Sequence, residues 1–415
     1  MKKWIVVCLI TLLFTQLVSC QMLPGIDIKA DETTTDIITS SNNAVFVVSH
    51  DTNSTMTETP TRLIYSIDSK LYYYNKITRE SYIFCFDPLC EHDFYLGCIS
   101  SKFSDSGDGL TSVQYCEHNN RFYALRGDKL CSFSFDGSDL KIEYSFGEEG
   151  DFDNFYYLTK MSNLSIWKNR VYFSRTDEEL GTREIWYFNI DNQSVVNLTK
   201  NLQGSAGSIL IQNDSLYFQY IDDTNSGIYR SDMDLKFMER IVNGRSSFGT
   251  NSVFHDDKVY YIDYESVEKD GAYTYVPKAI VCQDLAGSDV TDLYHIDDGV
   301  LPDLLAVTNS SIYFRKEDKK YFGYEIVRET MRVDKYNSYS KIYCLDIATG
   351  ECEVVFDDML CEVDELYFLS EKNVLILGEY CKGKEGDAWK YQKLFTAEID
   401  ETGNFINLSI QEVQK

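Results

Sequence analysis

Three cysteines and a histidine lie close together in the stretch CFDPLCEHDFYLGC, which runs from Cys85 to Cys98. Thiolate and imidazole groups are the usual ligands of zinc and other soft metals. Cys85, Cys90, His92 and Cys98 could form a Cys3His zinc site, although the single residue between Cys90 and His92 makes it awkward for both to bind one ion. Disulfide bonds from Cys85 to Cys90 or from Cys90 to Cys98 are an alternative, and unpaired thiols are a third.

A second Cys-Glu-His tripeptide follows, because YCEHNN places Cys116 and His118 at the spacing already seen for Cys90 and His92. If both tripeptides lie on connections at one face of the fold, they could approach each other. The sequence does not show whether they meet. Cys116 and His118 are therefore further candidates for a metal site or for disulfide bonds.

The remaining cysteines are more typical of structural roles. Apart from Cys8 and Cys20 the chain has ten cysteines, an even number that could form five disulfides outside the cytoplasm. Cys131 and Cys282 lie on predicted strands and are expected in the core. Two further pairs are predicted to face each other across hairpins, Cys344 with Cys352 and Cys361 with Cys381.

The compartment is indicated by the first residues of the chain. Lys2 and Lys3 precede an apolar run, Trp4 to Phe14, which is too short to span a bilayer comfortably and is followed by small residues. The tetrapeptide LVSC ending at Cys20 resembles the lipobox of bacterial lipoproteins. That resemblance implies a diacylated Cys20, and two acyl chains make a durable membrane anchor.

These features predict three segments. Residues 1–19 are expected to be a lipoprotein signal peptide, residues 20–42 a flexible tether rich in Thr, Ser and Asp, and residues 43–415 a single folded domain. The protein would then lie on the extracytoplasmic face of the cell membrane. Removal of residues 1–19, which contain two lysines and no acidic residue, changes the formal net charge from −27 to −29. A chain this acidic is not expected to bind nucleic acid.

An internal repeat predicts the fold. Seven copies of a short pattern, in which apolar or aromatic residues run into Asp, Asn or Gly, are spaced about 54 residues apart. The copies begin at Leu71, Leu130, Ile185, Ile228, Ile280, Ile342 and Leu394. We therefore predict an all-β fold, a β-propeller with seven blades, with six or eight as alternatives. The innermost strand of the first blade is expected within NAVFVVS, residues 43–49.

A second pattern supports the same division of the chain into repeats. A polar turn followed by an apolar residue, a tyrosine and another apolar residue occurs upstream of five of the copies, at Tyr123, Tyr172, Tyr217, Tyr260 and Tyr313. Because this tyrosine recurs at the same position of each repeat, we expect it to pack between neighbouring blades and not to form a sugar-stacking surface. Aromatic residues of predicted loops, such as Tyr273 and Tyr275, are better candidates for ligand contact.

These repeats resemble the propellers of the YWTD type and of the Tol-system translocation protein. Together with the LVSC box, the chain is similar to surface lipoproteins of low-GC Gram-positive bacteria that carry a C-x4-C-x-H motif after the first blade. The resemblance implies a fold and a location. It does not imply a reaction, because propellers occur both in enzymes and in binding proteins.

The sequence leads to one main hypothesis and two alternatives. It lacks a G-x-S-x-G elbow, an HExxH motif and a Walker loop, and His50, His255 and His295 have no recognisable nucleophile partner. The main hypothesis is a lipid-anchored extracytoplasmic propeller that binds a protein, peptide or glycan of the cell envelope without catalysis and without a required cofactor. One alternative is a polysaccharide hydrolase or lyase with carboxylates in the propeller channel. The other is a metal-binding or redox role for the Cys/His loop, with zinc as the metal.

Overall fold

The structure is a computed structural model, and the residues that it describes fall in the folded part of the chain. They are residues 45–46, 56–67, 70–86, 90, 98, 111–146, 161–177, 181–222, 224–243, 252–269, 272–286, 289–317, 340–357, 361–382 and 389–414. Contacts divide the chain into Met1–Thr39 and Ser40–Lys415. The predicted signal peptide, Cys20, the tether and His92 all lie outside the described residues.

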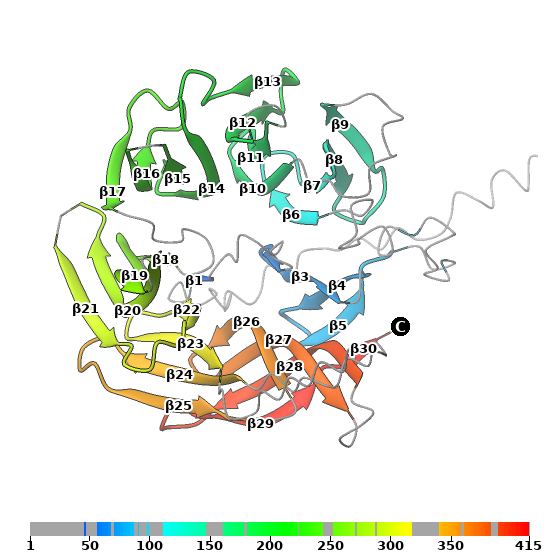
Figure 1. The fold of residues 1–415 in the computed structure, drawn as a ribbon. Helices are drawn as coiled ribbons and strands as arrows, with labels where there is room; N and C mark the ends of the chain where they lie inside the picture. The colour runs from blue at the N-terminus through cyan, green and yellow to red at the C-terminus, as the bar shows by residue number, and fades with distance from the viewer. Residues whose placement is uncertain are drawn as a thin grey trace, which may run out of the picture. The chain divides into compact units, whose positions relative to one another are not determined.

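Seven small antiparallel sheets form a ring within Ser40–Lys415, so the predicted seven-bladed β-propeller is confirmed (Figure 1). The strands of each blade run in chain order from the centre of the ring to the rim, with β1 (Val45–Phe46) added on the inner side of blade six and β30 (Val413–Gln414) on the outer side of blade one. Every regular element among the described residues is a strand. The search of those residues found no helix long and apolar enough to cross a membrane.

The first four blades have regular hairpin connectivity. Blade one consists of β2 (Thr57–Glu58), β3 (Arg62–Ile67), β4 (Lys70–Asn75) and β5 (Glu80–Ile83). Blade two consists of β6 (Thr111–Cys116), β7 (Arg121–Arg126), β8 (Lys129–Ser134) and β9 (Lys141–Ser145). Blade three consists of β10 (Met161–Trp167), β11 (Arg170–Thr176), β12 (Arg183–Asn189) and β13 (Ser194–Asn197). Blade four consists of β14 (Ser205–Gln212), β15 (Ser215–Ile221), β16 (Ser226–Ser231) and β17 (Glu239–Asn243).

Blades five and seven contain the longest strands. Blade five consists of β18 (Ser252–His255), β19 (Lys258–Lys269), β20 (Ala272–Asp284) and β21 (Val290–His295). Blade six consists of β22 (Asp303–Val307), β23 (Ser311–Glu317), β24 (Ser340–Asp346) and β25 (Cys352–Phe356). Blade seven consists of β26 (Cys361–Ser370), β27 (Asn373–Lys382), β28 (Trp389–Ile399) and β29 (Phe405–Ile410).

The seven copies of the sequence repeat are the third strands of the seven blades. At or just after the end of each third strand, an Asn or Asp side chain accepts a hydrogen bond from the backbone N–H two residues further on. These side chains belong to Asn75, Asp136, Asn189, Asp232, Asp284, Asp346 and Asp400. Such bonds stabilise a tight turn, which explains why the repeat ends in these residue types.

Apolar side chains fill each of the seven junctions between neighbouring blades. The five repeated tyrosines lie on the second strands of blades two to six, and each packs toward the following blade. They are at most 7% exposed. The prediction that they pack between blades is therefore confirmed. Burial also raises the pKa of Tyr123 and of Tyr172, each to about 12.

Both ends of the folded part pair with distant blades. The predicted inner strand of blade one, residues 43–49, is wrong, because β1 (Val45–Phe46) pairs with β22 of blade six. The inner strand of blade one is instead β2, joined to β3 by a turn in which Thr59 accepts a hydrogen bond from the N–H of Arg62. At the other end, β30 (Val413–Gln414) pairs in parallel with β5 and adds a fifth strand to blade one.

Candidate metal centre

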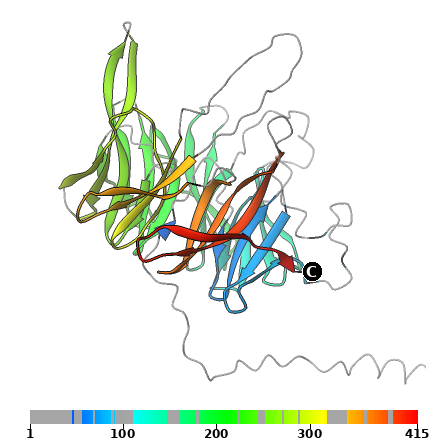
Figure 2. The ribbon, with the colours of Figure 1, turned by 90° about the horizontal axis from the view of Figure 1, so that it is seen from below.

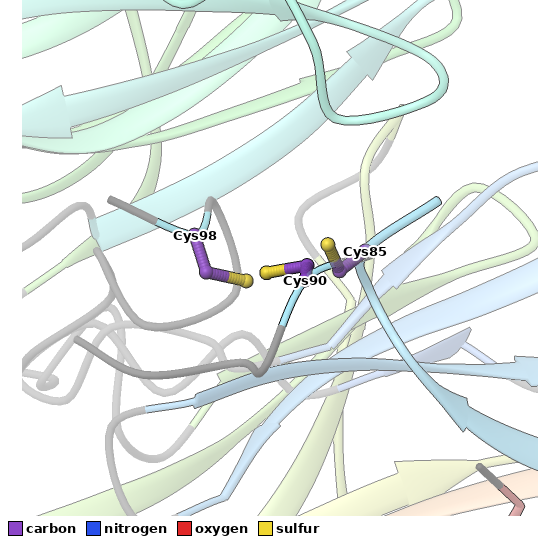
Figure 3. A group of neighbouring side chains, drawn as sticks. All are labelled: Cys85, Cys90 and Cys98. Atoms are coloured by element: carbon purple, nitrogen blue, oxygen red, sulfur yellow. The ribbon is translucent and has the colours of Figure 1, made fainter. Parts of the chain in front are cut away.

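Three of the predicted ligands come together between blade one and blade two. The sulfur atoms of Cys85, Cys90 and Cys98 all lie within 4.8 Å of one another, and Figure 3 shows them converging from separate points of the chain. Cys98 is buried, whereas Cys85 and Cys90 are partly exposed. His92, the fourth predicted ligand, lies outside the described residues.

Cys85 is positioned by the aromatic residues on either side of it. Phe84 is fully buried at the junction of blades one and two, and its N–H donates to the carbonyl of Leu71. Phe86 stacks on Tyr73 with ring centroids 5.5 Å apart and packs edge-on against Phe84. The chain is thus fixed before and after Cys85, which limits the movement of its sulfur without any help from a metal.

An arginine joins this aromatic group to blade two. The guanidinium of Arg62 lies 4.7 Å from the ring centroid of Tyr73, 4.8 Å from that of Phe86 and 4.4 Å from that of Phe135. Its Nη1 atom is buried without a hydrogen-bond partner among the described residues. Cation–π contacts at these distances are favourable, more so when the cation is desolvated. A positive charge is therefore held against the residue that follows Cys85.

The second Cys-Glu-His unit is placed elsewhere. Cys116 is fully buried at the junction of blades two and three, where its sulfur donates to the carbonyl of Lys168 at 3.7 Å. Burial raises the pKa of the Cys116 thiol. His118 lies at the surface, with its Nε2 atom 2.9 Å from Oδ1 of Asp191 in blade three. Neither residue belongs to the group formed by the three clustered cysteines.

The predicted pairing of Cys344 with Cys352 is wrong. Asp346 bonds across the turn to Glu351, so Leu345 stands opposite Cys352 and Cys344 stands opposite Glu353. Side chains alternate between the faces of a strand, and the two cysteines therefore point to opposite faces of blade six. Cys344 packs toward blade seven and Cys352 toward blade five, and neither forms a disulfide in the structure.

The other predicted cysteine positions fall into two groups. Cys131 and Cys282 are buried at blade junctions, as predicted for core residues. In the backbone register of blade seven, Cys361 stands opposite Tyr380, and Cys381 stands opposite Lys390. Their proposed disulfide remains a prediction, because the described part of those residues is limited to the backbone.

Three clustered thiols suit a soft metal. In a tetrahedral zinc site with zinc–sulfur bonds of about 2.3 Å, the sulfur atoms lie about 3.8 Å apart. The observed limit of 4.8 Å therefore requires each sulfur to shift by no more than about 1 Å. A disulfide would join only two of the three sulfurs at about 2.05 Å. The residues present thus fit a zinc ion, which in such a site would hold the connection between the two blades.

Two groups of side-chain contacts involve the inner strands of blades five, six and seven. Arg315 donates to Asp303 at 2.9 Å and contacts Asp364 at 3.4 Å, so that one guanidinium bridges the inner strands of blades six and seven. His255 is buried and its Nε2 atom lies 2.8 Å from Oδ1 of Asn309.

One exposed feature was not predicted from the sequence. β18 pairs with β19 only as far as Tyr261, and β21 pairs with β20 only as far as Ala279. Beyond those points β19 and β20 continue as a ribbon, defined here as Tyr264–Lys269 paired with residues 272–277, without a third strand among the described residues. In Figure 2 this yellow-green hairpin extends past the other strands. Tyr273 and Tyr275 lie in it, not in a loop.

Comparisons with known proteins support the fold alone. No protein-family model and no curated protein matches the sequence. The chain is similar in structure to a puromycin hydrolase complexed with PGG, with a TM-score of 0.50, 9% identity and coverage of 87% of this chain and 54% of that one. It is also similar to an oligogalacturonate lyase from Vibrio parahaemolyticus (TM-score 0.49, 8% identity, coverage 88% and 93%).

A third similar structure is a TolB of Agrobacterium tumefaciens, with a TM-score of 0.39, 16% identity and coverage of 70% of this chain and 90% of that one. This chain spans about half the length, 54%, of the puromycin hydrolase. Because propellers carry many activities, none of these similarities transfers a reaction, and the chain is a seven-bladed β-propeller whose function rests on its own residues.

Proposed function

We propose that this propeller is a non-catalytic binding protein of the cell envelope, held at the extracytoplasmic face of the membrane by a lipid on Cys20, and that its partner is an envelope protein or peptide. The observation that carries this proposal is the ribbon of blade five. It has six residue pairs beyond the supported part of the blade. Tyr264, at its base, packs against the junction of blades five and six, whereas Glu265 to Glu268 are exposed.

An unsupported two-stranded ribbon is only marginally stable in water, because each strand lacks a neighbour on its outer side. Residues Glu265 to Glu268 are exposed, including Val267 at 40% exposure. Such a strand edge can add a strand from another protein. Pro277 removes one backbone donor from the β20 side, which leaves the β19 side as the better edge for pairing.

The test shortens the ribbon without touching the ring. Replacing residues 265–276 by Asn-Gly would join Tyr264 to Pro277, which already stand opposite each other, through a two-residue hairpin turn. The matched control shortens another long hairpin by placing Asn-Gly between Lys382 and Trp389 in blade seven. Both variants are made in the mature chain with Cys20→Ser.

Retention of each variant on immobilised envelope fractions is then measured before and after protease treatment of those fractions. We expect saturable retention of the parent chain and of the control, loss of retention on protease-treated fractions, and loss of retention for the shortened ribbon. Equal retention of both variants would remove the ribbon from the proposal. Turnover of an envelope polysaccharide that disappears when a channel acid is replaced would favour the hydrolase or lyase instead.

The anchor has its own test. Cys20→Ser in the full-length chain is expected to move the protein from the membrane fraction into the medium, because no acyl chain can then be attached. Circular dichroism should remain that of the parent fold. A protein that stays membrane-bound after this substitution would contradict the lipid anchor, while leaving the binding role of the ribbon open to the test above.

A further inference from the structure

We propose that Cys85, Cys90 and Cys98 bind one zinc ion, which fastens the connection between blade one and blade two. The proposal goes beyond envelope binding and does not depend on it. Its basis is the approach of three sulfur atoms to within 4.8 Å of one another, although the residues are five and eight positions apart in the chain. Figure 3 shows the sulfurs of Cys90 and Cys98 facing each other, with Cys85 beside them.

The surroundings explain why the cysteines meet at this place. β5 ends at Ile83, and the aromatic pair around Cys85 fixes the first sulfur against the junction of blades one and two. Cys98 is buried at 5% exposure, although β6 begins only at Thr111. The sulfur of Cys98 lies within 4.8 Å of those of Cys85 and Cys90, so all three could bind one ion.

The choice of metal follows from the donor atoms. Three thiolates are soft ligands, which select zinc, copper(I) or iron and not magnesium or calcium. Zinc needs no change of oxidation state, and its tetrahedral preference accepts three thiolates and one further ligand. Each thiol that binds gives up its proton to solvent, so one zinc ion displaces three protons.

The fourth ligand of the zinc ion would be either His92 or a water molecule. The sequence places His92 between two of the cysteines, and its position lies outside the described residues. A zinc ion with four protein ligands is typically structural, whereas one that keeps a water position can also react. A connection that joins two blades, and that is anchored by aromatic packing on blade one, suits the structural type.

The experiment measures metal content and thiol state together. The mature chain with Cys20→Ser, purified under reducing conditions, is analysed by elemental analysis and by native and denaturing mass spectrometry. We expect one zinc per chain in the native state and fully reduced thiols in the denatured state. Cys85→Ser and Cys90→Ser should each lower zinc affinity by at least about tenfold, and Cys116→Ser, the matched control, should leave it unchanged.

Cobalt substitution gives a second readout, because thiolate-to-cobalt charge-transfer absorption grows with the number of thiolate ligands. That absorption should weaken in each cluster variant and persist in Cys116→Ser. His92→Ala changes the cobalt spectrum only if the imidazole is the fourth ligand. Zinc that survives in both cluster variants would place the metal elsewhere and overturn the proposal. A metal-free native chain that is lighter by about 2 Da per bridge would show a disulfide instead.

Discussion

The two Cys-Glu-His units have the same tripeptide and different surroundings. Cys116 ends β6 and is fully buried between two blades, where it acts as a small apolar residue. Cys90 lies in the connection between blades, where its sulfur meets those of Cys85 and Cys98. The comparison shows that a short motif does not determine its own chemistry. A cysteine within a strand of the ring is used for packing, whereas cysteines in a long connection can gather around a ligand.

The largest difference in stability should come from placing a charge at Cys116 and, separately, at Cys90. Cys116→Asp would bury a carboxylate among apolar side chains, and we expect it to lower the free energy of unfolding by about 3 kcal/mol or more. In metal-free protein, Cys90→Asp should cost less than about 1 kcal/mol, because that side chain is partly exposed. Urea unfolding of the two variants measures the difference. Equal costs would remove the distinction between the two units.

Metal removal should also affect variants of the two Cys-Glu-His units differently. A ligand that binds only the folded state at 1,000 times its Kd stabilises that state by about 4 kcal/mol. We therefore expect a chelator to lower the unfolding temperature of the parent chain and of Cys116→Ala by the same amount. Cys90→Ser should show a smaller decrease, because its affinity for the metal is lower. A decrease in Cys90→Ser equal to that of the parent would mean that the chelated metal is not held by this residue.

A smaller effect is expected at alkaline pH from the ring cysteine Cys352. Burial raises the pKa of its thiol to about 11, from an ordinary value of 9.0, so the folded state favours the protonated thiol. The resulting stability is complete below about pH 9 and is lost as the pH rises toward 11. Allowing for partial exposure, Cys352→Ala should reduce the loss of stability between pH 8 and pH 11 by about 1 kcal/mol. Urea midpoints at both pH values measure it, and an unchanged loss would contradict a titrating thiol at this position.

The smallest effect belongs to the histidine of the second unit. His118 and Asp191 are both well exposed, at 41% and 56% of their side chains, and such surface pairs are strongly screened by water and salt. His118→Ala should leave the urea midpoint unchanged within error at both low and high salt. A clear loss of stability, or loss of zinc from the native chain, would show that His118 has a role beyond this surface contact.

The local features of the fold could be predicted from the sequence. Each third strand ends in an Asn or Asp whose side chain stabilises its turn, and this signal depends only on residues close together in the chain. The burial of the tyrosines on the second strands was equally predictable, because a position that is buried in every repeat holds the same residue type in each copy. Seven blades followed directly from these two patterns.

The errors lie where the structure depends on register or on distant pairing. Cys344 and Cys352 were assigned to one face, but four residues separate Asp346 from its partner Glu351 in the turn, and this shifts the register by one. β1 was assigned to blade one because it is near in sequence, whereas it pairs with β22, more than two hundred residues away. The types and spacing of Cys85, Cys90 and Cys98 predicted that they could meet at one site. They left a metal site, disulfides and unpaired thiols open, because a connection without periodicity gives no information about its path.

The closing of the ring affects when the protein can fold. Glu58 of β2 accepts a hydrogen bond from Tyr367 of blade seven at 2.6 Å, across 309 positions of the chain. β5 can pair with β30 only after nearly the whole sequence has been synthesised. Blade one is made first and its partner last, so its apolar side toward blade seven stays uncovered for most of synthesis. Contacts so distant in sequence form slowly. A chain that is synthesised in this order therefore passes through a long interval in which its first blade lacks its neighbour.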